Sequence, residues 1–175
     1  EIENNPHLLI LSSDHQIKNE KKFRDIIEIA KKYSNENKLV TFGVIPTSPE
    51  TGYGYIKSEK PFNNKTLNGI KISEFIEKPN LTKAKQLIKD KSITWNSGIF
   101  MFKANTIIHE IKKFCPEIYK VCEETFIKSK KDLDFLRLNE DPFKNCPNIS
   151  IDNAVMEKTN KAIVLPLDAQ WSDIG

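Results

Sequence analysis

The sequence predicts an α/β three-layer sandwich, with helices on both faces of a mixed, mostly parallel sheet. Three short apolar runs, at 7–13, 39–45 and 161–168, are typical of parallel strands that are covered on both faces. Between the first two runs, apolar residues recur with helical spacing over 19–34. Strand, helix and strand in this order predict a βαβ unit with a right-handed crossover and a parallel strand pair.

The middle of the chain predicts an antiparallel hairpin and one longer strand. Residues 53–60 and 70–78 have strand character, and an Asn-rich turn at 63–69 joins them. Residues 92–103 form another strand, in which Gly98 marks a bulge or the close approach of a ligand.

Four further helices complete the expected elements. Thr82 can cap a short helix through its side-chain oxygen. Helical spacing covers 105–114 and 116–127, and a proline fits the first position of the second of these helices. Ser150 can cap the last helix.

The length and charge of the chain favour a single domain, over residues 1–175, that binds neither nucleic acid nor a membrane. The net charge is +3, and Lys and Arg are spread along the chain as on an ordinary solvated surface. No apolar run approaches the ~18 residues of a membrane span. The three cysteines lack the spacing of a zinc site, so we expect reduced thiols and a cytoplasmic protein.

Two aspartates stand at places where distant strands can bring them together. Asp14 follows the first apolar run, and Asp173 follows Trp171 and Ser172 near the other end of the sequence. Ligands of open α/β sheets bind beyond the carboxyl ends of the strands, so both carboxylates can meet at one divalent metal. Taken alone, an aspartate at such a place is more often a turn residue or a helix cap than a metal ligand. His15 can orient a ligand or pack in the interior.

A second group of residues has the chemistry of a sugar-phosphate site. Gly54 lies inside a strand pattern, where the missing Cβ lets the backbone approach a ligand. Glu77 can accept hydrogen bonds from sugar hydroxyls, and Lys78 is a compact cation suited to a phosphate. Asn96 offers both a donor and an acceptor. The alternatives are a surface ion pair for the Glu-Lys dipeptide and a turn for the asparagine.

Five segments in this order resemble the mannose-1-phosphate guanylyltransferase family, in the bacterial form that is often fused to a phosphomannose isomerase domain. They are TFGVIPTSPETGYGYI (41–56), FIEKP (75–79), WNSGIFMF (95–102), SIDNAVMEK (150–158) and WSDIG (171–175). The resemblance spans essentially the whole chain. It implies the three-layer nucleotide-diphospho-sugar transferase fold, which is Rossmann-like. It also implies a reaction in which α-D-mannose 1-phosphate and GTP give GDP-mannose and diphosphate, for polysaccharide biosynthesis.

The resemblance also implies a role for individual residues. Asp14 and Asp173 hold the catalytic Mg²⁺, and Lys78 meets the phosphate of the sugar. The mannose hydroxyls are bound by Glu77 and Asn96. Beside the sugar ring lie two residues of the TGYGYI segment, Tyr53 and Gly54.

One part of the family pattern has no counterpart in this sequence. The family begins with a glycine-rich loop, GGxGTRLxPLS, that cradles the triphosphate, whereas the six glycines here are scattered along the chain. We therefore expect an N-terminally truncated part of a nucleotidyltransferase domain that keeps the sugar half and does not turn over GTP by itself. A bare sheet edge would favour homo-oligomers or other self-association of the truncated chain.

Two other functions fit the same residues. The first is a nucleotidyltransferase for another hexose 1-phosphate, such as glucose 1-phosphate, which Glu77, Lys78 and Asp173 would serve equally well. The second is a non-catalytic sugar-phosphate sensor on the same fold. Isomerase chemistry needs a metal-binding β-barrel, and the sequence has no His-rich strand pattern, so we set this activity aside for the chain.

Overall fold

The computed structural model describes residues 4–62 and 67–175, and the chain divides into two compact units. The first unit consists of Glu1–Thr106 and Asn160–Gly175, and the second of Ile107–Thr159. Every residue predicted to bind metal, sugar or phosphate lies in the first unit. None of the described helices is both long and apolar enough to cross a bilayer.

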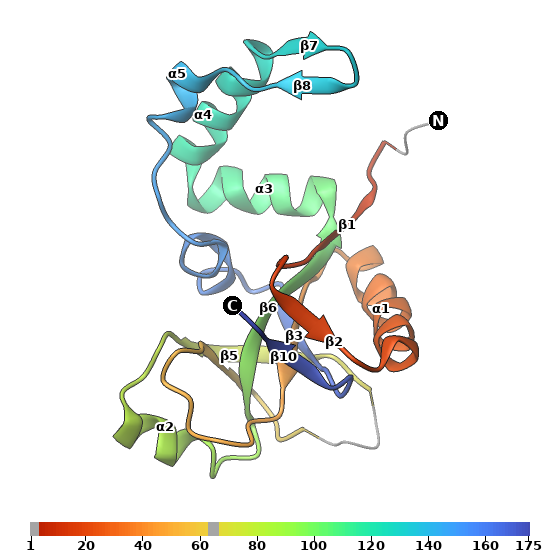
Figure 1. Cartoon of the computed structure of the whole chain (residues 1–175), viewed down its shortest axis with the longest axis vertical. Coiled ribbons are helices and arrows are strands. Elements are labelled where there is room, and N and C mark those ends of the chain that lie inside the picture. Colours follow the sequence, from red (N-terminus) through yellow and green to blue (C-terminus); the bar gives the residue numbers. More distant parts are fainter. Residues whose placement is uncertain (1–3, 63–66) are drawn as a thin grey trace. The chain divides into compact units, whose positions relative to one another are not determined.

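A six-stranded sheet forms the body of the first unit (Figure 1). In spatial order its strands are β1 (His7–Ile10), β6 (Ile93–Lys103), β3 (Leu39–Val44), β9 (Ala162–Pro166), β5 (Ile70–Ile76) and β4 (Tyr55–Ser58). The strand β4 pairs with β6 as well as with β5, so the strands from β6 to β4 close into a ring. The long β6 thus joins the first strand of the chain to the hairpin.

The strand directions of this sheet differ from the prediction. The sheet is mixed, as expected, but β3 and β9 are the one parallel pair that the described strands form, and the other pairs are antiparallel. The prediction of a mostly parallel sheet is therefore wrong. The expected pairing of β1 with β3 is also wrong, because β6 lies between them and is antiparallel to both. The βαβ pattern gave the direction of these two strands correctly, and not their adjacency.

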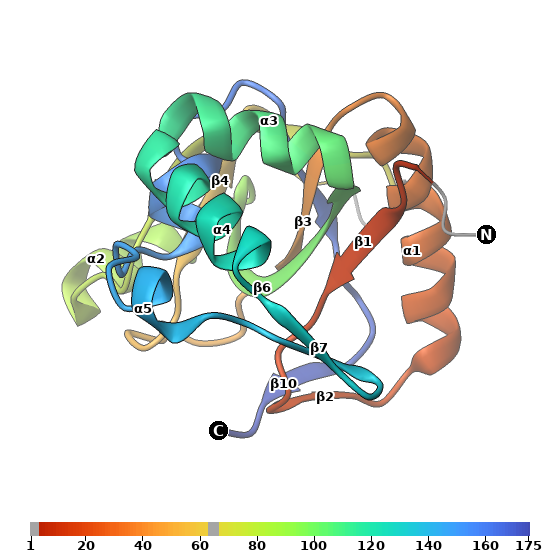
Figure 2. The ribbon, with the colours of Figure 1, turned by 90° about the horizontal axis from the view of Figure 1, so that it is seen from above.

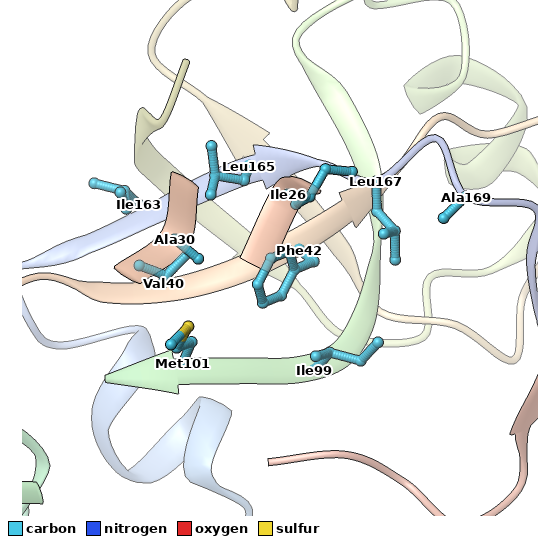
Figure 3. Close-up of a cluster of buried hydrophobic side chains, with 10 residues drawn as sticks. All are labelled: Ile26, Ala30, Val40, Phe42, Ile99, Met101, Ile163, Leu165, Leu167 and Ala169. Carbon is cyan, nitrogen blue, oxygen red and sulfur yellow. The ribbon is translucent and has the colours of Figure 1, made fainter. Parts of the chain in front are cut away.

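The core lies between this sheet and α1 (Glu20–Asn35), which matches the predicted helix. Asn19 caps the helix, and its side-chain oxygen accepts from the Lys22 N–H at 3.0 Å. Ile26 and Ala30 on the helix are buried against the sheet. Figure 3 shows the whole cluster: Ile26, Ala30, Val40, Phe42, Ile99, Met101, Ile163, Leu165, Leu167 and Ala169. Each large side chain buried here contributes about 1.5–3 kcal/mol to stability.

The predicted hairpin is formed by β4 and β5, which pair in an antiparallel register. Its expected turn at 63–69 falls partly outside the described residues. The helix that follows, α2 (Leu81–Leu87), is capped by Asn80, whose oxygen accepts from the Lys83 N–H at 2.9 Å. The predicted cap at Thr82 is therefore wrong by two residues. Gly98 adopts φ +67° inside β6, which confirms that the strand departs from regular geometry there.

The second unit contains helices and a small hairpin. Its elements are α3 (Ala104–Phe114), which begins in the first unit, α4 (Pro116–Ile127), β7 (Lys130–Asp132), β8 (Phe135–Arg137), α5 (Glu140–Phe143) and a π-helix (Asp152–Met156). The two longer helices confirm the prediction, with Pro116 in the first turn of α4. Ser150 precedes the π-helix, and its hydroxyl accepts from the Asn153 N–H at 3.4 Å. The pattern had predicted an α-helix there.

Candidate active site

Two short strands bring the predicted metal residues together. The strand β2 (His15–Ile17) pairs with β10 (Trp171–Asp173) in an antiparallel register that sets Asp173 opposite His15. Figure 2 shows the two strands side by side near the C-terminus. The Ile174 N–H donates to the carbonyl oxygen of Asp14 at 3.0 Å and extends the pairing by one step. Asp14 and Asp173 are thus neighbours in space although they are far apart in sequence.

Gly175 lies against both carboxylates. A Cβ atom on this glycine would stand 2.7 Å from Asp14 Oδ2, closer than real side chains come. The Gly175 N–H donates to Asp173 Oδ1 at 3.0 Å. The missing Cβ of this glycine therefore lets the backbone lie close to the Asp14 carboxylate while its N–H binds the Asp173 carboxylate.

The aspartates offer a site that fits Mg²⁺ better than a transition metal. Their ligand atoms are all carboxylate oxygens, the type that Mg²⁺ prefers, and Mg²⁺ takes its remaining ligands from water and phosphate. Within residues 4–62 and 67–175, no cluster of three or more His, Cys, Asp or Glu side chains could hold a metal by itself. The Asp14 side chain is 55% exposed, so a bound ion could keep its waters. His15 Nε2 is 3.9 Å from Asp14 Oδ1, too long for a hydrogen bond.

Three of the predicted sugar-binding residues meet at one place, which we call the sugar edge: Gly54, Glu77 and Asn96. A Cβ on Gly54 would lie 3.1 Å from Glu77 Oε2 and 3.6 Å from Asn96 Cβ, so any larger residue would require the Glu77 carboxylate to move by a few tenths of an ångström. The Asn96 N–H donates to the Gly54 carbonyl at 2.8 Å. The amide oxygen of Asn96 accepts from Thr41 Oγ1 and from the Gly98 N–H, which fixes the orientation of the amide.

The backbone of Lys78 is strained. The backbone of this residue has φ +37°, a region that residues other than glycine rarely adopt. Its Nζ is 3.8 Å from Glu77 Oε1, and the side chain is 65% exposed. Such strain persists where the surrounding structure holds a residue in place, and it is concentrated at functional sites. The strained backbone therefore presents the Lys78 ammonium to solvent beside the sugar edge.

The ring of Tyr53 packs edge-on against Trp95 and Trp171. Burial raises the pKa of the Tyr53 hydroxyl above 10.0, and the carboxylates of Asp173 and Glu50 raise it further. Tyr53 therefore stays neutral at physiological pH. Its ring packs against the buried cluster that contains Trp95, and direct contact with a substrate stays a prediction.

Comparison with known proteins identifies the family of this chain. The family model described as nucleotidyl transferase matches residues 1–175. The chain belongs to the nucleotidyl transferase family. This confirms the family that the five segments had indicated.

Curated relatives of this nucleotidyl transferase carry a more specific name. The mannose-1-phosphate guanylyltransferase of Salmonella montevideo is 47% identical over 177 residues, which cover 99% of this chain and 37% of the relative. The mannose-1-phosphate guanylyltransferase of Escherichia coli (strain K12) is 42% identical, over 99% of the chain and 36% of the relative. The chain thus spans little more than a third of the length of these proteins.

Solved structures support the predicted fold of the nucleotidyl transferase. The crystal structure of mannose-6-phosphate isomerase from Helicobacter pylori superposes with a TM-score of 0.84 at 34% identity, covering 95% of this chain and 64% of that one. That of mannose-1-phosphate geranyltransferase from Thermus thermophilus gives a TM-score of 0.79 at 29% identity, over 95% and 46%. The nucleotide-diphospho-sugar transferase fold is therefore confirmed.

Sequence patterns missed the two short strands, β2 and β10, that bring the predicted metal residues of this nucleotidyl transferase together. Both β2 and β10 have three residues each, too few for a period to show. The sequence patterns also did not predict the contact between the His15 and Trp171 rings. In the sequence, the one signal for both strands was their position next to the two aspartates.

Proposed function

We propose that this chain is the sugar-phosphate-binding part of a mannose-1-phosphate guanylyltransferase. In the proposed reaction the phosphate of α-D-mannose 1-phosphate attacks the α-phosphorus of GTP, which gives GDP-mannose and diphosphate. The observation that carries the proposal is the meeting of Gly54, Glu77 and Asn96 at one edge, in a chain whose curated relatives bear this name. We place the reaction in the cytoplasm, as a supply step for polysaccharide synthesis.

The residues of the sugar edge can bind hydroxyl groups of a hexose. The Glu77 carboxylate accepts hydrogen bonds from hydroxyl groups, and such charge-assisted bonds are the stronger kind. The oxygen of the Asn96 amide is oriented by its two donors, which leaves the amide nitrogen on the side of Gly54, 3.9 Å from the place a Cβ would take. The amide nitrogen carries two hydrogens and can donate one of them to a sugar hydroxyl that in turn donates a hydrogen bond to Glu77.

The phosphate of the sugar needs binding groups more than activation. A phosphate monoester loses its second proton near pH ~6, so the nucleophile is already ionised and no general base is required. Two anionic substrates repel each other, and the Lys78 ammonium offsets part of this repulsion. The residues that would hold Mg²⁺ are Asp14 and Asp173, and a bound ion would neutralise charge on the transferred phosphoryl group.

Calorimetry on the 175-residue chain tests the proposal, with mannose 1-phosphate as the ligand and Mg²⁺ present. We expect binding that Glu77→Gln weakens by about tenfold, the equivalent of about 1.4 kcal/mol for one charge-assisted hydrogen bond. The matched control is Glu74→Gln, an exposed residue of β5, the strand that ends one residue before Glu77. Equal binding by the two variants would contradict the assigned role of Glu77.

Other ligands separate the alternatives. Tighter binding of glucose 1-phosphate than of mannose 1-phosphate would support a nucleotidyltransferase for another hexose. Conversion of mannose 6-phosphate to fructose 6-phosphate by the chain would support an isomerase, the activity named for the Helicobacter pylori structure. Sequencing the gene upstream of residue 1 distinguishes enzyme from sensor, because an intact GGxGTR loop supports the enzyme and a degraded loop supports the sensor.

A further inference from the structure

Four aromatic rings of the first unit make consecutive edge-on contacts, and we call them the aromatic ladder. The His15 and Trp171 rings are 5.1 Å apart at 81°, and the Trp171 and Tyr53 rings are 5.7 Å apart at 67°. Tyr53 continues to Trp95, with centroids 5.2 Å apart at 75°. All three contacts have the spacing and the T-shape that aromatic pairs prefer.

Each ring of the ladder belongs to a residue within two positions of a residue of the site. Trp95 precedes Asn96, and Tyr53 precedes Gly54, so one end of the ladder adjoins the sugar edge. At the other end, His15 follows Asp14 and lies opposite Asp173 in the pairing of β2 with β10. Trp95 and Asn96 are successive residues of β6, so their side chains point to opposite faces of the sheet. Trp171 lies two positions before Asp173 in β10 and His15 pairs with Asp173, so these two rings share one face of the strand pair with the Asp173 side chain. The ladder thus connects the metal residues to the sugar edge.

Packing, more than hydrogen bonding, holds the ladder together. Trp95 is 7% exposed, and the His15 side chain is 11% exposed. The buried atoms His15 Nδ1 and Trp171 Nε1 have no hydrogen-bond partner in the part of the chain that the structure describes. Ring contacts therefore set the positions of these two side chains, and removal of one ring leaves its neighbours without their support.

We propose that the aromatic ladder positions the metal residues and the sugar edge relative to each other, so that occupation of either one strengthens binding at the other. Tyr53 and Trp171 are then positioning residues, since both stand in the middle of the ladder. This inference rests on the proposed function, because it takes a sugar phosphate as the ligand of the sugar edge. Such coupling arises when a ligand at one binding region makes the other region more rigid, and the effect on affinity is the same in both directions.

The strength of coupling is measured by titrating the chain with Mn²⁺, as a paramagnetic probe for Mg²⁺, with and without saturating mannose 1-phosphate. The ratio of the two Kd values is the coupling factor. Tyr53→Leu removes the central ring, and we expect it to lower this factor by about fivefold or more, within the usual range of allosteric coupling. Tyr53→Phe keeps the ring and is expected to retain most of the coupling. Tyr119→Leu, on α4 of the second unit, controls for the loss of a tyrosine.

Direct attraction between the metal ion and the phosphate is the same in all three variants. A difference in the coupling factor between Tyr53→Leu and Tyr53→Phe therefore measures the contribution of the Tyr53 ring. A wild-type coupling factor in Tyr53→Leu would overturn the proposal. The absence of mannose 1-phosphate binding in the wild-type chain would instead contradict the proposed function.

A second measurement does not depend on the folding of Tyr53→Leu. The chain has two tryptophans, and both belong to the ladder. In Trp171→Phe, the remaining Trp95 next to the sugar edge should change its emission when Mn²⁺ alone is added. In Trp95→Phe, the remaining Trp171 should respond to mannose 1-phosphate alone. If each tryptophan responds only to the ligand at its own end, the proposed coupling along the ladder is wrong. The titration with Mn²⁺ remains informative even if the chain does not bind mannose 1-phosphate.

Discussion

Gly54→Ala tests how closely the backbone and the Glu77 carboxylate approach each other at the sugar edge. The added Cβ would stand 3.1 Å from Glu77 Oε2, so the carboxylate must move by a few tenths of an ångström. The Glu77 side chain is 52% exposed and can move toward solvent, so we expect a change in stability below about 1 kcal/mol. A displaced carboxylate loses a charge-assisted hydrogen bond to the sugar, worth about 1.5–3 kcal/mol. Binding should weaken by roughly 10- to 150-fold.

The assay for Gly54→Ala is calorimetric titration with mannose 1-phosphate, with urea unfolding of the same samples. Gly52→Ala is the matched control, because a Cβ at this nearby glycine would meet no atom within 4 Å. Neither glycine has a positive φ, so backbone strain does not distinguish the two variants. Equally tight binding of the sugar phosphate by Gly54→Ala and Gly52→Ala would refute this reasoning, since the crowding of Glu77 would then have no effect on the ligand.

Two further predictions concern strain and pH. Lys78→Gly should raise the free energy of unfolding by about 1 kcal/mol, because glycine accepts φ +37°, and should weaken mannose 1-phosphate binding because the ammonium is lost. Lys78→Ala should weaken binding to a similar extent without the gain in stability. Equal free energies of unfolding for the two variants would contradict the assignment of strain to Lys78. The N–H and hydroxyl of Ser92 donate to Asp90 and lower its pKa below 3.8, so this carboxylate stabilises the fold above that pH and its contribution is lost as the pH falls through the lowered pKa. Urea unfolding from about pH 2 to 6 should therefore show the stability difference between wild type and Asp90→Asn shrinking on acidification, and a constant difference would contradict this.

The elements with many apolar repeats were predictable from the sequence. The helix α1 spans four turns with a clear apolar stripe, and β3 is buried along its length. Local pattern therefore identified both. The order of strands in the sheet depends on contacts between distant segments. No local sequence pattern therefore predicted that β6 lies between β1 and β3.

The candidate site was predictable only in part. Gly54 drew notice as a glycine inside a strand pattern, and the structure supplies the reason, which is the carboxylate of Glu77 beside it. The prediction that Asp14 and Asp173 share one metal site rests on their positions after strand-like runs and on family resemblance, because the short strands β2 and β10 that pair beside them show no pattern of their own. The aromatic ladder joins rings from four separate segments, and no spacing in the sequence predicts such contacts.

The most direct test of the account is Mn²⁺ binding by the chain, followed by the electron paramagnetic resonance of the free ion. We expect wild-type chain to bind Mn²⁺ in the presence of mannose 1-phosphate, and Asp14→Asn and Asp173→Asn each to weaken it by at least about tenfold, since each removes one of two anionic ligands. Asp168→Asn is the control, because this exposed aspartate is paired with Lys22. Undiminished Mn²⁺ binding by either Asp14→Asn or Asp173→Asn would show that the two carboxylates do not share a metal.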